Sequence, residues 1–199
     1  MSDVKLGLGE SPDPVFLFVG ESLDEQGNVY PWHLYDHDAK KPVPVKQRAL
    51  TGVVTGLRMS LKIFKDKQNV KLDIHMMADK PYVIRTGVDT TFARGVLLAM
   101  EMVDDFTDPL TLVVANGGEK VVFGRLHRAN SERIKVAWDK ERKLFPLVNK
   151  IQKRLFQEPQ SWADVQATEQ ARDWGEPERN DAPEPPDDFN DRDLDDAPF

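Results

Sequence analysis

The sequence contains no cysteine, so neither a disulfide framework nor a cysteine-ligated metal site can form. It has no apolar run close to the roughly 18 residues that a membrane-spanning helix requires, and residues 1–10 lack the charged and then apolar pattern of a signal peptide. It also lacks a glycine-rich phosphate loop, a nucleophile elbow and a metalloprotease motif. These absences predict a cytoplasmic protein that is not an enzyme and needs no cofactor.

Metal ligands are scarce as well. Of the four histidines, only His33 and His37 lie close together, and their spacing of four, with Asp36 and Asp38 nearby, would suit a metal ion bound on a helix. Pro31 and the strand-like residues around it argue against a helix at this place. We therefore predict ordinary polar surface here and no metal site.

The net charge of −7 is unevenly distributed along the chain. Residues 1–45 carry 3 basic and 8 acidic side chains (net −5), residues 46–156 carry 21 and 12 (net +9), and residues 157–199 carry 3 and 14 (net −11). A basic middle followed by a strongly acidic end is typical of a nucleic-acid-binding protein with an acidic interaction tail. The plainer alternative is a surface charge that is uneven without a function.

Alternation of apolar and polar residues dominates the middle of the chain, as expected of half-buried strands. The pattern predicts strands, in chain order, at residues 57–64, 70–77, 82–85, 110–115 and 120–126, with a sixth at 133–136 left open. Helical spacing of Phe92, Val96 and Met100 predicts a helix over 92–103, between the third and fourth of these strands. Asp89, Thr90 or Thr91 can supply its N-cap.

The order of three strands, a helix and two strands within about 90 residues is typical of an OB-fold, a five-stranded Greek-key barrel. Two further strands are expected near the N-terminus, at 15–20 and 29–35, and this segment could belong to the barrel. A basic helix starting at Phe145 and a short helix starting at Ser161 are expected near the C-terminus. The predicted organisation is an N-terminal extension over residues 1–45, an OB-fold nucleic-acid-binding domain over 46–138, a helical segment over 139–174 and a disordered acidic tail over 175–199.

Basic and aromatic residues occupy the strand positions opposite the predicted core. Phosphates need cations and unstacked bases need flat apolar surfaces, so this combination predicts a single-strand-binding platform. The predicted nucleic-acid-binding residues are Arg58, Lys62, Phe64, Lys71, His75, Phe123 and Arg125. The alternative for Phe64 and Phe123 is a place in the core at a strand end, since barrels contain bulges that change the alternation.

The chain ends in Asp-Arg-Asp-Leu-Asp-Asp-Ala-Pro-Phe over residues 191–199. This end resembles the acidic tip of bacterial single-stranded DNA-binding proteins, in which several aspartates precede an isoleucine, a proline and a C-terminal phenylalanine; phage proteins of this class have a similar tail. The matching residues are Asp195, Asp196, Pro198 and Phe199. Ala197 stands where the family usually has isoleucine, and Leu194 interrupts the aspartates.

The resemblance implies sequence-independent binding and protection of single-stranded DNA in replication, recombination or repair, by a nucleoid-associated homo-oligomer. It also implies that the tip docks replication, recombination and repair proteins, with Phe199 in an apolar pocket and the aspartates against a basic rim. Two alternatives are a protein-interaction adaptor or recombination mediator whose tail only increases solubility, and an RNA-binding OB module.

Overall fold

The computed structural model describes residues 13–64, 67–118 and 120–170, with the backbone alone at Phe64, Lys67, Glu169 and Gln170. The predicted tail over 175–199, and with it the predicted docking residues Asp195, Asp196, Pro198 and Phe199, lies outside the described residues. The elements are β1 (Val15–Leu23), β2 (Val29–Asp36), β3 (Lys41–Pro44), β4 (Ala49–Phe64), β5 (Lys67–Met77), β6 (Pro81–Gly87), α1 (Thr91–Glu101), β7 (Leu110–Asn116), β8 (Val122–His127), α2 (Leu144–Arg154) and α3 (Trp162–Gln170).

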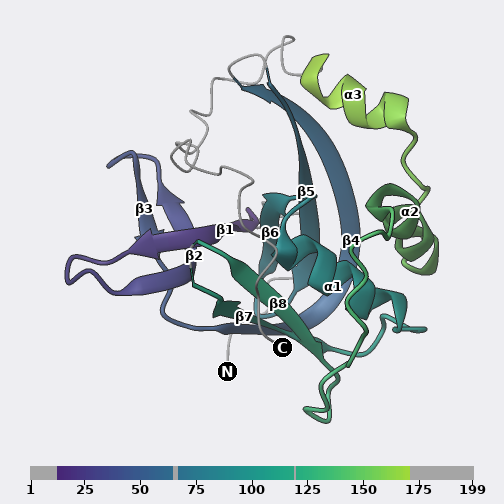
Figure 1. Cartoon of the computed structure of the whole chain (residues 1–199), viewed down its shortest axis with the longest axis horizontal. Coiled ribbons are helices and arrows are strands. Elements are labelled where there is room, and N and C mark those ends of the chain that lie inside the picture. The colour runs from purple at the N-terminus through teal and green to yellow at the C-terminus, as the bar shows by residue number, and fades with distance from the viewer. Residues whose placement is uncertain (1–12, 65–66, 119, 171–199) are drawn as a thin grey trace, which may run out of the picture.

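All of these strands belong to one mixed sheet in the order β3-β2-β1-β6-β5-β4-β7-β8. The pairs are antiparallel except for β1 and β6, which run parallel. Strand β4 is long and curved (Figure 1) and changes partner along its length: residues 49–52 pair with β7 and residues 53–64 pair with β5. Gly52 lies at this change, where an added Cβ would be 2.5 Å from the carbonyl oxygen of Met77. Strand β4 therefore joins the two halves of the sheet.

The fold is mainly β, as predicted, but the strands form one mixed sheet that is not closed into the five-stranded barrel predicted for an OB-fold. The extension predicted over residues 1–45 supplies β1, β2 and β3 to the same sheet. Strand β6 pairs with β5 along one edge and with β1 along the other. To close a barrel, β8 would have to pair with the edge that β1 occupies. Within the described residues, β8 pairs along its length only with β7. In place of the sixth strand left open over 133–136, the structure has a single bridge between His127 and Arg133.

The predicted alternation is confirmed in the central hairpin. Leu57, Met59 and Leu61 of β4 are buried and lie opposite Ile74, Leu72 and Val70 of β5. These side chains, with those of α1, form one core cluster. The alternation shifts by one position at a bulge between Val54 and Gly56. Because the apolar side chains point to the core, the opposite face of β4 and β5 carries mainly polar side chains.

The helix between β6 and β7 is also confirmed, and Thr90 is its N-cap because its Oγ1 accepts the N–H of Ala93 at 3.1 Å. Phe92 and Val96 of α1 pack directly on the backbone of β8 at Gly124. A Cβ at Gly124 would lie 2.3 Å from Val96 Cγ2, so this close approach requires glycine.

The two C-terminal helices lie along one side of the molecule near β4 (Figure 1). Helix α2 is fastened to the end of α1 by Arg154, whose Nη1 donates to the carbonyl oxygens of Glu101 and Val103, each at 2.7 Å. Helix α3 begins with the predicted capping box: Asp164 Oδ2 accepts the Ser161 N–H at 2.6 Å, and Ser161 Oγ accepts the Asp164 N–H at 3.2 Å. None of the described helices is both long enough and apolar enough to cross a membrane.

Candidate functional site

The side of β4, β5 and β6 opposite the core carries a row of charged side chains. Arg58 of β4 lies opposite Asp73 of β5, which in turn lies opposite Arg85 of β6. The Asp73 carboxylate is buried and accepts two hydrogen bonds from Arg85, from Nε at 2.8 Å and from Nη2 at 2.7 Å. This bidentate pair fixes the Arg85 guanidinium on the sheet. We call this side the outer face; its ionisable residues are Arg58, Lys62, Lys71, Asp73, His75 and Arg85.

The structure brings together four of the residues predicted to bind nucleic acid, namely Arg58, Lys62, Lys71 and His75, on the outer face. Arg58 is exposed and the other three are half-buried. The side chain of Phe64 lies outside the described atoms.

Phe123 and Arg125 lie elsewhere, on β8, because β4 and β7 stand between β5 and β8 in the sheet. The half-buried ring of Phe123 covers Gly117, where an added Cβ would be 2.2 Å from the ring. Arg125 is exposed. The predicted residues therefore form one group of four and a separate pair.

The aromatic part of the site was not predicted from the sequence; it comes from β1 and β2. Phe16 and Phe18 flank the buried Leu17 and point to the opposite side of the sheet. Their rings are stacked, with centroids 6.3 Å apart and planes 24° apart, and Phe18 stacks in turn on His33 of β2 at 5.7 Å and 19°. We call Phe16, Phe18 and His33 the aromatic ladder. All three residues are half-buried.

The aromatic ladder runs into the outer face because β1 pairs in parallel with β6. Phe18 lies opposite Arg85 in this pairing, and the Arg85 guanidinium carbon is 5.1 Å from the centre of the Phe16 ring. A cation over an aromatic face at this distance is attracted by the ring. The alternation of Phe16 and Phe18 around Leu17 was visible in the sequence, but the sequence does not reveal the parallel pairing that brings these rings beside Arg85.

Burial lowers the pKa of both histidines at this site. For His75 burial is the main cause, Arg58 and Arg85 lower its pKa further, and Asp73 opposes the shift. For His33 burial is again the main cause, opposed by a hydrogen bond with the backbone of Gly20. Both imidazoles are therefore neutral at pH 7. The positive charge of the outer face at pH 7 comes from its lysines and arginines.

The edge of β4 that β7 leaves uncovered is bound by side chains from the C-terminal segment. The hydrogen bonds run from Leu57 N to Gln157 Oε1 (2.8 Å), from Met59 N to Gln160 Oε1 (2.6 Å), from Leu61 N to Thr168 Oγ1 (3.0 Å), from Gln152 Nε2 to Leu57 O (3.0 Å) and from Gln160 Nε2 to Met59 O (3.0 Å). We call Gln152, Gln157, Gln160 and Thr168 the glutamine clamp. It satisfies the backbone groups that a neighbouring strand would otherwise bind.

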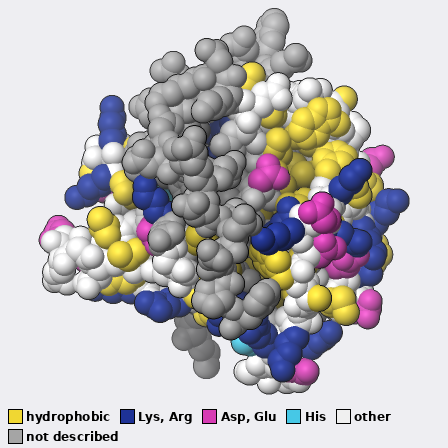
Figure 2. Space-filling model, in the orientation of Figure 1, with side chains coloured by type: hydrophobic (Ala, Val, Ile, Leu, Met, Phe, Trp, Pro, Cys, Tyr) yellow, Lys and Arg dark blue, Asp and Glu magenta, His cyan; other side chains and the backbone are white. Residues whose placement is uncertain are grey.

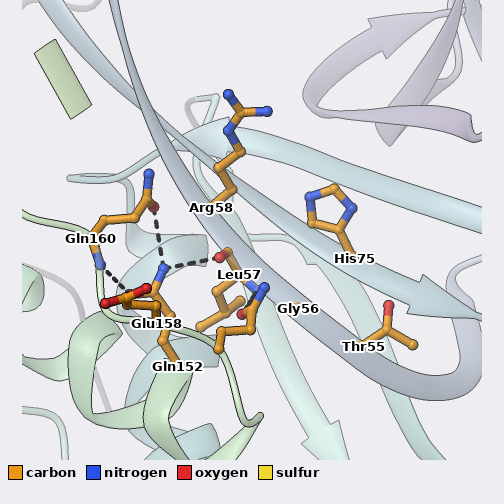
Figure 3. A pocket seen from close by; sticks show the side chains of 9 residues that line it. Thr55, Gly56, Leu57, Arg58, His75, Gln152, Glu158 and Gln160 are labelled. Carbon is orange, nitrogen blue, oxygen red and sulfur yellow. Dashed lines mark hydrogen bonds between the residues drawn. The ribbon is translucent and has the colours of Figure 1, made fainter. Parts of the chain in front are cut away.

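A polar pocket of about 370 Å³ lies between the bulge of β4 and the glutamine clamp (Figure 3). Its lining joins two outer-face residues, Arg58 and His75, to residues of the α2–α3 connection. The lining residues are Thr55, Gly56, Leu57, Arg58, His75, Gln152, Gln157, Glu158 and Gln160. The pocket is thus a direct continuation of the outer face.

In the described part of the chain, no three histidine, aspartate or glutamate side chains lie close enough together to hold a metal ion. Comparison with protein-family models, with curated proteins and with solved structures found no match.

Proposed function

We propose that the protein binds single-stranded DNA without sequence preference, along the aromatic ladder and the outer face, and protects it during replication, recombination or repair. The observation that carries the proposal is the joining of the aromatic ladder to a sheet surface with two arginines and two lysines. In this proposal the protein acts as a homo-oligomer, and its C-terminal tip recruits partner proteins.

The two halves of the site suit the two parts of a single strand. Exposed bases can stack against the aromatic ladder, an interaction worth about 1–3 kcal/mol per base in single-strand-binding proteins. Arg58 and the neighbouring cations of the outer face can neutralise the phosphates between those bases. In a duplex the bases are already paired and stacked, so the ladder favours single strands.

The arrangement of the central strands also supports the proposal. We propose that β4, β5, β6, α1, β7 and β8 are an open variant of the OB-fold, because their chain order is three strands, a helix and two strands. OB-folds bind oligonucleotides on the face of their second and third strands. These correspond here to β5 and β6, which carry Lys71, His75 and Arg85.

The acidic end of the chain fits the same proposal. Residues 157–199 carry a net charge of −11 and are tethered to the basic domain. A tethered anionic segment has a high effective concentration and competes with DNA for cations. Removing residues 176–199 should therefore tighten DNA binding at low salt, and should abolish recruitment of partner proteins through the tip.

The test is a fluorescence-anisotropy titration of a labelled oligo-dT at several salt concentrations, with a duplex of the same length as the comparison. Arg58→Ala should weaken binding and reduce the dependence of log Kd on log salt by about 0.7, the contribution of one phosphate contact on a single strand. Arg133→Ala is the matched control, since Arg133 is also exposed but lies outside the outer face.

Preferential binding to oligo-dT that weakens with salt and with Arg58→Ala, but not with Arg133→Ala, would support the proposal. If the protein binds duplex and single strand equally, or neither, the proposal is wrong. A matched oligo-U competitor separates DNA from RNA binding. An Arg125→Ala variant tests the separate pair on β8, which should contribute less than Arg58.

A further inference from the structure

Phe156 is exposed and has an unusual backbone conformation. It follows the end of α2, its side chain is 95% exposed, and its φ is +55°. The left-handed conformation at the end of a helix is usually taken by glycine or asparagine, because a Cβ is disfavoured there. A phenylalanine at this position is therefore unfavourable in two respects: its backbone is in the left-handed conformation, and its apolar ring is exposed to water.

The conformation of Phe156 is held by hydrogen bonds on both sides. The N–H groups of Leu155, Phe156 and Gln157 donate to the carbonyl oxygens of Ile151, Lys153 and Gln152, at 3.0, 3.2 and 2.9 Å. The next residue, Gln157, is itself fixed to β4 through the glutamine clamp. The ring is thus presented from a rigid support, which indicates a use for it outside the core.

Phe156 is not itself a lining residue of the polar pocket, but the next residue in the chain, Gln157, is. Gln157 lines it together with Arg58, Thr55 and Glu158. Within the described residues, the Arg58 guanidinium, Thr55 Oγ1 and Gln157 Nε2 make no hydrogen bond to another side chain or to the backbone, so these donors are free for a ligand. Glu158, which is exposed, supplies an acceptor.

We infer that Phe156 and the polar pocket form an end subsite that takes one unstacked nucleobase of a bound single strand; this rests on the proposed function. The outer face continues into the pocket through Arg58 and His75, so a strand lying on that face reaches the subsite without leaving the surface. Phe156 supplies the stacking surface and the pocket supplies polar groups for the edge of the base.

The mixture of groups favours a base over a phosphate. A base edge carries both donors and acceptors and can use the amide, hydroxyl, guanidinium and carboxylate groups together. A phosphate has acceptors only and would be repelled by Glu158. The volume of about 370 Å³ is at the small end of ligand pockets and is sufficient for a single base.

Hydrophobic side chains also gather on the surface around α2 and α3, with lysines and arginines beside them (Figure 2). Exposed apolar residues there include Phe156 and Trp162. Anchoring of a protein partner by Phe156 is the competing explanation, and it predicts no effect of Phe156 on the binding of DNA.

The decisive variant is Phe156→Gly, which removes the ring and relieves the backbone conformation at the same time. The variant should melt at a temperature equal to or above that of the wild type, yet bind oligo-dT about fivefold or more weakly, the effect of losing one stacked base. Met102→Ala is the matched control, because Met102 is also an exposed apolar residue, 55% exposed, at the end of a helix. It should leave the affinity unchanged.

Photo-crosslinking of oligo-dT carrying a single 5-iodouracil gives the position of the base. We expect a crosslink to Phe156 from one end of the oligonucleotide only, and its loss in Phe156→Gly. If the wild type binds oligo-dT and Arg58→Ala weakens it while Phe156→Gly does not, the subsite is overturned and the proposed function survives. If the wild type does not bind oligo-dT, the proposed function itself fails.

Discussion

The Gln160→Ala substitution tests whether side chains complete the edge of β4. Gln160 makes two hydrogen bonds to one residue: its Oε1 accepts the Met59 N–H at 2.6 Å and its Nε2 donates to the Met59 carbonyl at 3.0 Å. It also accepts a hydrogen bond from Gln152 at 3.2 Å. Each such bond contributes about 0.5–1.5 kcal/mol net. Because water replaces part of the loss at this half-buried edge, we expect the free energy of unfolding to fall by about 1–3 kcal/mol.

The assay is urea denaturation, with Gln166→Ala as the control, because Gln166 is exposed on α3 of the same segment. The control should change the free energy of unfolding by less than about 0.5 kcal/mol. Hydrogen exchange gives a local measurement: the Met59 amide should exchange faster in Gln160→Ala, while the Ile74 amide in the centre of the sheet changes less. Equal stabilities of the two variants, with the Met59 amide still protected, would refute the role of the clamp.

Two further predictions concern packing and pH. Gly124→Ala should lower the free energy of unfolding by about 1–3 kcal/mol in a thermal melt, because the added carbon meets Val96 at 2.3 Å, whereas Gly20→Ala, with nothing within 4 Å, should have little effect. Since burial lowers the folded-state pKa of His33 and His75, the unfolded chain binds more protons below about pH 6.5, and stability should fall as the pH drops from 7 to 5. His33→Phe, which keeps a ring against Phe18, should make that fall shallower; an unchanged pH dependence would contradict the assignment.

Local pattern predicted the central elements well. The alternation around Leu57, Met59 and Leu61 placed the long hairpin, and the apolar spacing of Phe92 and Val96 placed α1. The signals are local because each is a repeat within one element. Ser161 was predicted as a capping residue and Thr90 was one of three candidates for the same reason, since a cap is decided within four residues of the chain.

The candidate site was predicted only in part, because its geometry depends on pairing between distant strands. Arg58, Lys62, Lys71 and His75 lie on two strands that are consecutive in the chain, so their common face follows from the alternation and the hairpin pairing of neighbouring strands. The position of Phe18 opposite Arg85 depends on the parallel pairing of β1 with β6, which no local pattern encodes. The barrel predicted for an OB-fold does not close for the same reason: β1 pairs with the edge of β6 that a closing strand would need.

The glutamine clamp also escaped prediction. Glutamine at positions 152, 157 and 160 is an ordinary choice for a helix and a surface loop, and nothing in its spacing indicates bonds to a strand about 100 residues earlier. Such contacts become visible only when the uncovered length of β4 is known. The same holds for Phe156, whose exposure and backbone angle are properties of the folded chain.

The parallel pairing of β1 with β6 has a consequence for the order of folding. Residue 15 pairs with residue 82, and closing a loop of that size costs roughly 2 kcal/mol more than closing a short hairpin. Contacts so distant in sequence form late. During synthesis the chain must emerge beyond β6 before the rings of Phe16 and Phe18 reach their place beside Arg85. We therefore expect nascent chains to acquire the aromatic half of the site only after the central hairpin has formed.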